Sequence, residues 1–251
     1  MAHKSRKYEF TGETKNHCGV KLHRIRAIAD IAVFGIYSGD EGGWIASEKN
    51  LSHGGRAWVF DEAYVYDNAI VDGDARISDN ARVYGSALVF GNVYDNARVY
   101  GYAQVADNVH VHGDARVYGS ARVANNADIF GDARVYGYAQ VYGNAQVYGY
   151  GRVSGDVCVS GDAHVSGDAH VYNVNIVATR SDGCTFLVAP PRGSGPVVVI
   201  ARDFYSTLPE ARDYWTATLA NTPIGEETTA ILDHLERMAR IQGWSLGLPA
   251  N

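Results

Sequence analysis

Several residue types are scarce in this chain of 251 residues, and each scarcity argues against a class of protein. The chain has 3 cysteines, Cys18, Cys158 and Cys184, and no CxxC pair. This pattern argues against a disulfide framework or a cysteine-based zinc module, and it fits a reducing compartment. The chain has only 6 prolines but 28 glycines, which favours a glycine-punctuated β array over a disordered chain.

Long apolar runs and excess positive charge are absent as well. No apolar run is long enough to span a bilayer, and none follows the basic start as it would in a secretory signal. The net charge of -6 provides no general attraction for nucleic acid or for an anionic membrane. We therefore expect a cytoplasmic protein without membrane contact, and nucleic acid is not a favoured partner.

The dominant feature of the sequence is a six-residue repeat over residues 57–172. Each unit reads aliphatic, any, Gly/Asn/Asp, polar, small, any, as in the successive segments VYGSAR, VANNAD and IFGDAR from Val117 onward. The aliphatic position recurs every sixth residue from Val59 to Val89 and again from Val93 to Val171, which makes twenty units. The small position is nearly always Ala.

This period predicts a parallel β-helix. Each unit supplies one short strand and one bend, and three units close a triangular coil, so residues eighteen apart stack at about 4.8 Å. The aliphatic side chain points inward, Ala fits into the bend, and Gly, Asn or Asp adopts the left-handed backbone that the corner needs. Most parallel crossovers are right-handed, but strict hexads with a small corner residue resemble the known left-handed exception. We predict about six to seven left-handed coils.

One step in the repeat is short. Val89 and Val93 are four residues apart instead of six, so one coil should hold sixteen residues. If the register continues across this coil, the outward residues form three faces. Face A holds those around Val65, Val83, Val99, Val117, Val135, Val153 and Val171, face B those around Val89, Val105, Val123, Val141 and Val159, and face C those around Val59, Ile77, Val111, Ile129, Val147 and Val165.

The flanks of the repeat are two separate modules. Residues 1–56 lack the hexad, and we expect a small β cap in which Trp44 and Leu51 plug the open first coil. Residues 173–251 are predicted as an α+β module that packs on the last coil. Its expected elements are strands at 176–179, 185–189 and 197–201, a helix opened by the capping box Thr207–Glu210, and a second helix over about 226–242.

The hexads resemble the left-handed β-helix superfamily, which is best known for trimeric acyltransferases. The segments at 7–11, 24–27, 42–45 and 50–52 appear before the repeat in an order similar to that of bacterial and prophage-encoded hexapeptide-repeat proteins. These relatives are often labelled polymer-forming or putative acyltransferase. The resemblance covers about residues 7–172, and the C-terminal module more weakly resembles the tail of some phage members. It implies a phage or prophage setting and, by analogy, a homotrimer, but no particular reaction.

Four histidines are weak candidates for a catalytic base: His110, His112, His164 and His170. In the superfamily, the acyltransferases place such a base beside a loop that leaves the coil, at a subunit interface where coenzyme A lies in a groove. The hexads show no such loop, so exposed or interface histidines are the favoured interpretation. His110 and His164 are three coils apart, about 14 Å. Because zinc needs three converging ligands, we expect no metal site.

Face A is the sharpest candidate for a binding surface, because Arg stacks on Arg and Tyr on Tyr. The candidate residues are Arg98, Tyr100, Arg116, Tyr118, Arg134, Tyr136, Arg152, His170 and Tyr172. Such columns suit a polyanion, a planar ligand or a protein interface. Alternatively, the arginines pair locally, because like charges ~5 Å apart repel each other. The expected local partners are Asn80, Asn96, Asp114, Asp132, Tyr150 and Asp168. We favour local pairing, with face A as a self-association surface.

These patterns favour a non-enzymatic scaffold or binding protein of the phage type that acts through protein–protein interaction. Blocking a host factor, in an anti-defence role, is one form of this function. We expect no cofactor. The alternative is an acyltransferase that uses acyl-CoA, such as acetyl-CoA, with a His general base at a subunit interface. Ice binding is disfavoured because Thr is almost absent from the outward positions.

Overall fold

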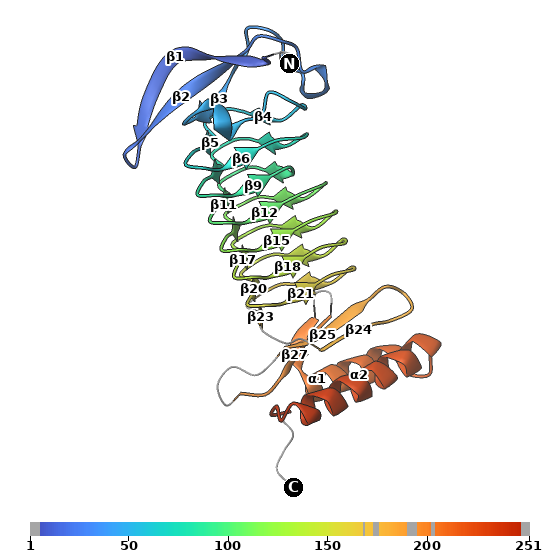
Figure 1. Ribbon diagram of the computed structural model, residues 1–251. Helices are drawn as coiled ribbons and strands as arrows, with labels where there is room; N and C mark the ends of the chain where they lie inside the picture. The colour runs from blue at the N-terminus through green and yellow to red at the C-terminus, as the bar shows by residue number, and fades with distance from the viewer. Residues whose placement is uncertain (1–5, 168, 173–175, 190–194, 202–203, 247–251) are drawn as a thin grey trace.

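The structure is a computed structural model that describes residues 6–167, 169–172, 176–189, 195–201 and 204–246. A column of stacked coils forms its middle, with a β cap at the N-terminal end and a mixed module at the C-terminal end (Figure 1). None of the described helices is long and apolar enough to cross a membrane.

Within the described residues, each of the twenty hexads contributes one short strand, and the strands form three parallel sheets. The sheets correspond to the three predicted faces. Face A contains β5 (Tyr64–Val65), β8 (Arg82–Val83), β11 (Arg98–Val99), β14 (Arg116–Val117), β17 (Arg134–Val135), β20 (Arg152–Ser154) and β23 (His170–Tyr172). Face B contains β6 (Ile70–Val71), β9 (Leu88–Val89), β12 (Gln104–Val105), β15 (Arg122–Val123), β18 (Gln140–Val141) and β21 (Cys158–Val159). Face C contains β4 (Trp58–Val59), β7 (Arg76–Ile77), β10 (Asn92–Val93), β13 (His110–Val111), β16 (Asp128–Ile129), β19 (Gln146–Val147) and β22 (His164–Val165).

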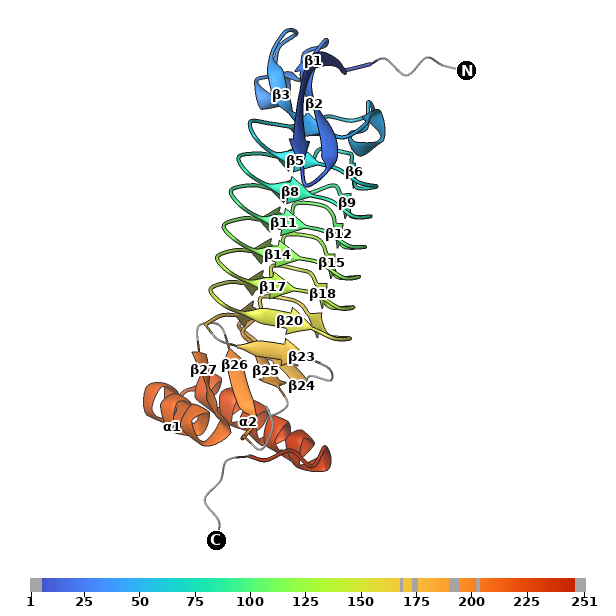
Figure 2. The same cartoon turned by 90° about the vertical axis from the view of Figure 1, so that its left-hand side faces the viewer.

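The coil is left-handed, as the hexads predict. In Figure 2, face A is toward the viewer, and the chain passes from β5 to β6 on its right before it returns as β8 one level lower. A chain that crosses the near side to the right while it descends follows a left-handed path.

The repeat positions have the predicted environments. All twenty inward aliphatic residues are at most 1% exposed, and the corner alanines are completely buried. The turns use the left-handed backbone, for example at Asp95 with φ 58° and Gly101 with φ 73°. A Cβ at Gly101 would lie 3.0 Å from the carbonyl oxygen of Gly119 in the next coil. The close stacking of corners thus explains why glycine dominates this position.

The short step leaves the register intact, which confirms the predicted faces. Arg98 pairs with Arg82, and Gln104 pairs with Leu88, each across sixteen residues. The chain saves two residues at a tight corner that contains Gly91. A Cβ at Gly91 would approach the carbonyl oxygen of Val109 to 3.0 Å, so the shortened corner requires a residue without a side chain.

The N-terminal cap is built from β1 (Tyr8–His17), β2 (Val20–Ala27), β3 (Glu41–Ile45) and the short 3-10 helices η1 (Ala32–Phe34) and η2 (Glu48–Asn50). Leu51 is buried in the column core, as predicted. The prediction for Trp44 was wrong, because Trp44 packs outside the column against Leu22 and Tyr66. Ile45 pairs with inward-facing Val65, so the alternation along β3 turns Trp44 outward beside Tyr64.

The C-terminal module contains an antiparallel sheet of β24 (Ile176–Thr179), β25 (Thr185–Ala189), β26 (Val198–Ala201) and β27 (Phe204–Thr207). Leu187, Ala189 and Ile200 join the column core and cover the last coil. The other side of the sheet packs on α1 (Leu208–Leu219) and α2 (Pro223–Ile241).

The predicted elements of this module are largely confirmed. The Thr207–Glu210 capping box opens α1. The second helix was predicted to start too late: Thr222 caps it, and Pro223 occupies its first turn, where the missing N–H is tolerated. Strand β27 was not predicted, since its residues are half-exposed or exposed and show no apolar alternation.

Candidate functional site

Face A carries a continuous row of arginines. Arg82, Arg98, Arg116, Arg134 and Arg152 are direct neighbours in successive strands. Each side chain is half-buried against the face. We call this row the arginine ladder.

The expected local pairing of the arginine ladder is not found with the partners that the structure describes. Within the described part of the chain, none of its five side chains makes a hydrogen bond or an ion pair, and only Arg82 shows a cation–π contact, 5.9 Å from the ring centroid of Tyr64. Asp114 and Asp132 sit exposed at the bend, while the arginines lie beside the tyrosine rings and influence their ionisation. Asp168, another expected partner, lies outside the described residues. The positive charge of the arginine ladder is therefore available to a binding partner on face A.

A second row on face A consists of stacked tyrosine rings, Tyr66, Tyr84, Tyr100, Tyr118 and Tyr136. Successive ring centroids are 5.0, 4.8, 4.9 and 4.9 Å apart, and the ring planes differ by 1 to 4°. Burial raises the pKa of Tyr66 to about 12. Burial also raises the pKa of Tyr100, against the opposing effect of the neighbouring arginines. The stacked rings of this tyrosine ladder form a flat, partly apolar strip.

The tyrosine ladder is closed at both ends. At the N-terminal end, His17 packs edge-on against Tyr66 at 5.7 Å, and Leu22 joins the same cluster. At the C-terminal end, Ser154 replaces the next tyrosine. His170 fills that space, with Nε2 at 2.8 Å from Oγ of Ser154 and at 3.3 Å from the hydroxyl of Tyr136. The hydrogen-bonded His170 thus has a structural role in the ladder.

Tyr172 completes the predicted binding residues of face A. Its ring centroid is 5.3 Å from that of His170, with the planes tilted by 37°. The structure therefore places all nine predicted binding residues on one sheet, β11 to β23.

The three remaining histidine candidates lie on face C and do not converge. The register runs from His110 through Asp128 and Gln146 to His164, so His110 and His164 are three coils apart. His112 is stacked between the rings of Tyr94 and Phe130, and its Nε2 is 3.1 Å from Oδ1 of Asp128. No group of three or more metal-ligating side chains occurs in the described ranges.

His110 is exposed, whereas the other three histidine candidates are half-buried. It is exposed and lines a hollow of about 280 Å³ beside the shortened coil, together with Arg76, Ser78, Asn92 and Tyr94. Between residues 57 and 167 the chain makes only short turns, and no loop leaves the coil. The loop that accompanies the catalytic histidine of the acyltransferases therefore has no counterpart beside His110.

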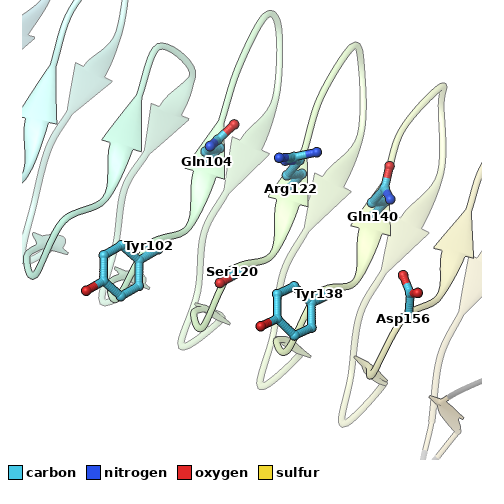
Figure 3. Close-up of a pocket in the computed structure, with 7 residues that line it drawn as sticks. All are labelled: Tyr102, Gln104, Ser120, Arg122, Tyr138, Gln140 and Asp156. Atoms are coloured by element: carbon cyan, nitrogen blue, oxygen red, sulfur yellow. The ribbon is translucent and has the colours of Figure 1, made fainter.

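Face B contains a groove that the sequence analysis missed. It measures about 650 Å³ and runs along the edge between faces A and B (Figure 3). The lining residues are Tyr102, Gln104, Ser120, Arg122, Tyr138, Gln140 and Asp156. The outward residues of face B vary from coil to coil, so no row of identical side chains marks the groove in the sequence. The available signal was an aromatic residue at the same bend position in alternate coils, Tyr102 and Tyr138.

Comparison with known proteins supports the repeat. A family model described as YdcK Beta solenoid repeat matches residues 75–91, 93–113 and 139–155. The chain carries β-solenoid repeats. The first two matched segments are separated by one residue, Asn92, the first residue of β10, which directly follows the shortened corner at Gly91. No curated protein matches the chain.

Proposed function

We propose that this chain is a non-enzymatic scaffold or binding protein of a phage or prophage, and that it acts through protein–protein contact on face A. The supporting observation is the arginine ladder without acidic partners among the described residues. Cations repeated at about 4.8 Å repel each other. An acidic surface laid against the ladder removes this repulsion, while the tyrosine ladder supplies flat apolar area for the contact.

A second copy of the chain has suitable acidic groups. Asp114 and Asp132 are exposed, one coil apart, at the corner between faces C and A. They share the spacing of Arg116 and Arg134, so two ion pairs can form at once between copies. The contact joins two different patches, and a contact of this kind closes into a ring when the rotation between copies divides a full turn evenly, whereas any other rotation gives an open filament. The expected ring is a homotrimer.

Charge reversal tests this contact. Arg116→Glu with Arg134→Glu is expected to shift the chain from trimer to monomer in sedimentation velocity runs at low salt. Adding Asp114→Arg and Asp132→Arg restores opposite charges across the same contact and is expected to restore the trimer. A wild-type chain that is monomeric at all salt and protein concentrations contradicts self-association.

A host protein with an acidic surface would bind the same ladder. Capture of one stoichiometric partner from host lysate by the wild-type chain, and its loss with the charge-reversed variant, would support a host-factor role. Capture that does not depend on Arg116 and Arg134 would contradict the assignment to face A.

The alternative function, an acyltransferase, receives one observation in its favour. His110 is exposed in a hollow with Arg76, which could attract a phosphate group of acyl-CoA. Calorimetric titration with acetyl-CoA tests this function. Saturable micromolar binding that disappears in His110→Ala would replace the scaffold proposal. The matched control is His164→Ala, three coils away on the same face.

A further inference from the structure

The groove on face B contains two highly exposed aromatic side chains. Tyr102 is 70% exposed and Tyr138 is 69% exposed. They occupy the same bend position two coils apart, about 9.6 Å, and Ser120 occupies this position in the coil between them. Figure 3 shows both rings broadside to the viewer, on one side of the groove. Unlike the stacked tyrosines of face A, these rings leave their faces open to a ligand.

A row of polar side chains runs parallel to the two rings. Gln104, Arg122 and Gln140 are direct neighbours in successive strands, and all three are exposed. Figure 3 places this row beside the tyrosines, and Asp156 follows Tyr138 at the same bend position in the next coil. The groove thus combines two amides and one guanidinium along a line about two coils long, with one carboxylate in the neighbouring bend column.

These polar groups are available for a ligand. None of the side chains that line the groove has a hydrogen-bond or ion-pair partner in the part of the chain that the structure describes. The corner between faces B and C shows the opposite arrangement. There, the Asn108 side chain donates to Asn126, Asn126 donates to Asn144, and Asn144 donates to Asp162. A polar column of this solenoid can therefore bond to itself, and the groove on face B does not.

The set of groups matches the chemistry of an acidic sugar chain. Open aromatic faces stack on the C–H faces of pyranose rings, and Gln amides both donate to and accept from neighbouring hydroxyls. A guanidinium binds a carboxylate through two parallel hydrogen bonds. We propose that the groove binds an acidic oligosaccharide, with pyranose rings on Tyr102 and Tyr138 and a uronate carboxylate on Arg122.

The geometry favours a glycan over an acidic peptide. An extended peptide repeats its side chains on one face every ~6.6–6.8 Å, which does not match the spacing of about two coils between the tyrosines. A peptide that adds a strand also needs a free sheet edge. The strands at the groove, β12, β15 and β18, are each paired on both sides. The groove therefore offers a ligand side-chain contacts and no free backbone edge.

Calorimetric titration of the full chain tests the proposal. The acidic probes are hexasaccharides of galacturonate, mannuronate, guluronate and hyaluronan. The comparison probes are a neutral 1,4-linked galactose hexasaccharide, free galacturonate and hexaglutamate. We expect at least one acidic hexasaccharide to bind saturably with a Kd of about 1 mM or lower, and to bind at least ~10-fold more tightly than each comparison probe.

Neighbouring coils supply conservative variants. Arg122→Gln installs the side chain of Gln104 and Gln140, and it is expected to weaken the binding of the acidic hexasaccharide ~10-fold or more. Tyr102→Ser and Tyr138→Ser install the side chain of Ser120, and each is expected to weaken binding about 5-fold. Tyr150→Ser, at the corner between faces C and A, is the matched control and should leave binding unchanged. Circular dichroism verifies that each variant keeps the β-helix.

Several results would overturn the proposal. One is that none of the four acidic hexasaccharides binds saturably. Another is that the neutral hexasaccharide, free galacturonate or hexaglutamate binds as tightly as the best acidic hexasaccharide. The third is that binding survives Arg122→Gln or the combined Tyr102→Ser and Tyr138→Ser change. Arg116→Gln on face A separates this groove from the contact proposed above. It should affect self-association and leave the oligosaccharide affinity unchanged.

Discussion

The phenol rings of Tyr100 and Tyr118 lie face to face, with their centroids 4.9 Å apart and their planes within 1°. Eighteen residues separate them in the sequence, one full coil. The backbone of the solenoid thus places identical side chains directly above one another. Packing against another secondary-structure element is not needed to align them. The stacked tyrosines are therefore expected to contribute to stability, and the exposed Tyr102 and Tyr138 to the proposed glycan binding, so mutations can separate these two roles.

Tyr118→Ala and Tyr102→Ala make the same chemical change near the corner between faces A and B, in two adjacent coils. Tyr118 is half-buried and stacked on both sides, at 4.9 Å from Tyr100 and from Tyr136. Its loss is expected to lower the free energy of unfolding by about 2 kcal/mol. Tyr102 is 70% exposed, so its loss should cost less than about 0.5 kcal/mol. Urea denaturation measures both. Equal costs would contradict a stabilising role for the tyrosine ladder.

Arg116→Gln should stabilise the isolated chain slightly. Arg116 lies between Arg98 and Arg134 in the ladder, and the substitution removes the repulsion from both neighbours. We expect a gain of about 0.5 kcal/mol at low ionic strength and almost none at 0.5 M salt, where surface charges are screened. Denaturation at protein concentrations too low for self-association measures this change in the free energy of unfolding. A loss of stability at low salt would indicate that the arginine is satisfied in place.

The stability of the chain should fall between pH 10 and pH 12. Burial raises the pKa of Tyr66 to about 12, whereas a tyrosine in the unfolded chain ionises near 10. In this window Tyr66 therefore holds more protons in the folded state than in the unfolded state, so its contribution to the free energy of unfolding decreases as the pH rises and levels off above the window. Tyr66→Phe removes one ionising group and should make the decrease shallower. The same slope in both chains would contradict the burial of this phenol.

Gly43→Ala should weaken the attachment of the N-terminal cap. A Cβ at Gly43 would lie 2.7 Å from the carbonyl oxygen of Phe60 and 2.9 Å from that of Ala63, both in the backbone of the first coil. The coil has to shift, at an expected cost of about 2 kcal/mol. Gly54→Ala is the control, because its Cβ would meet only the Ser52 hydroxyl, at 3.5 Å. Thermal unfolding of the two variants measures the difference. Unchanged stability of Gly43→Ala would mean that the cap is not tightly seated.

The column could be predicted from sequence in detail because its physics is local. Val and Ile every six residues, with Ala and Gly at fixed offsets, determine strand, bend and coil, and a four-residue step still allows neighbouring coils to pair, as Arg98 with Arg82 shows. The predicted binding residues were all placed on one face for the same reason. Trp44 was misplaced because the cap follows no repeat, and its direction depends on how β3 pairs with β5.

The sequence by itself determined the left-handed coil, its three faces and the rows of identical side chains, because a strict period transmits each local choice to every coil. Only the tertiary structure decided which side chains are satisfied. It left the arginine ladder without acidic partners among the described residues, it let the asparagines of one corner bond to each other, and it opened the groove between Tyr102 and Tyr138. These outcomes depend on the directions that long side chains take at the bends, and a six-residue pattern does not encode those directions.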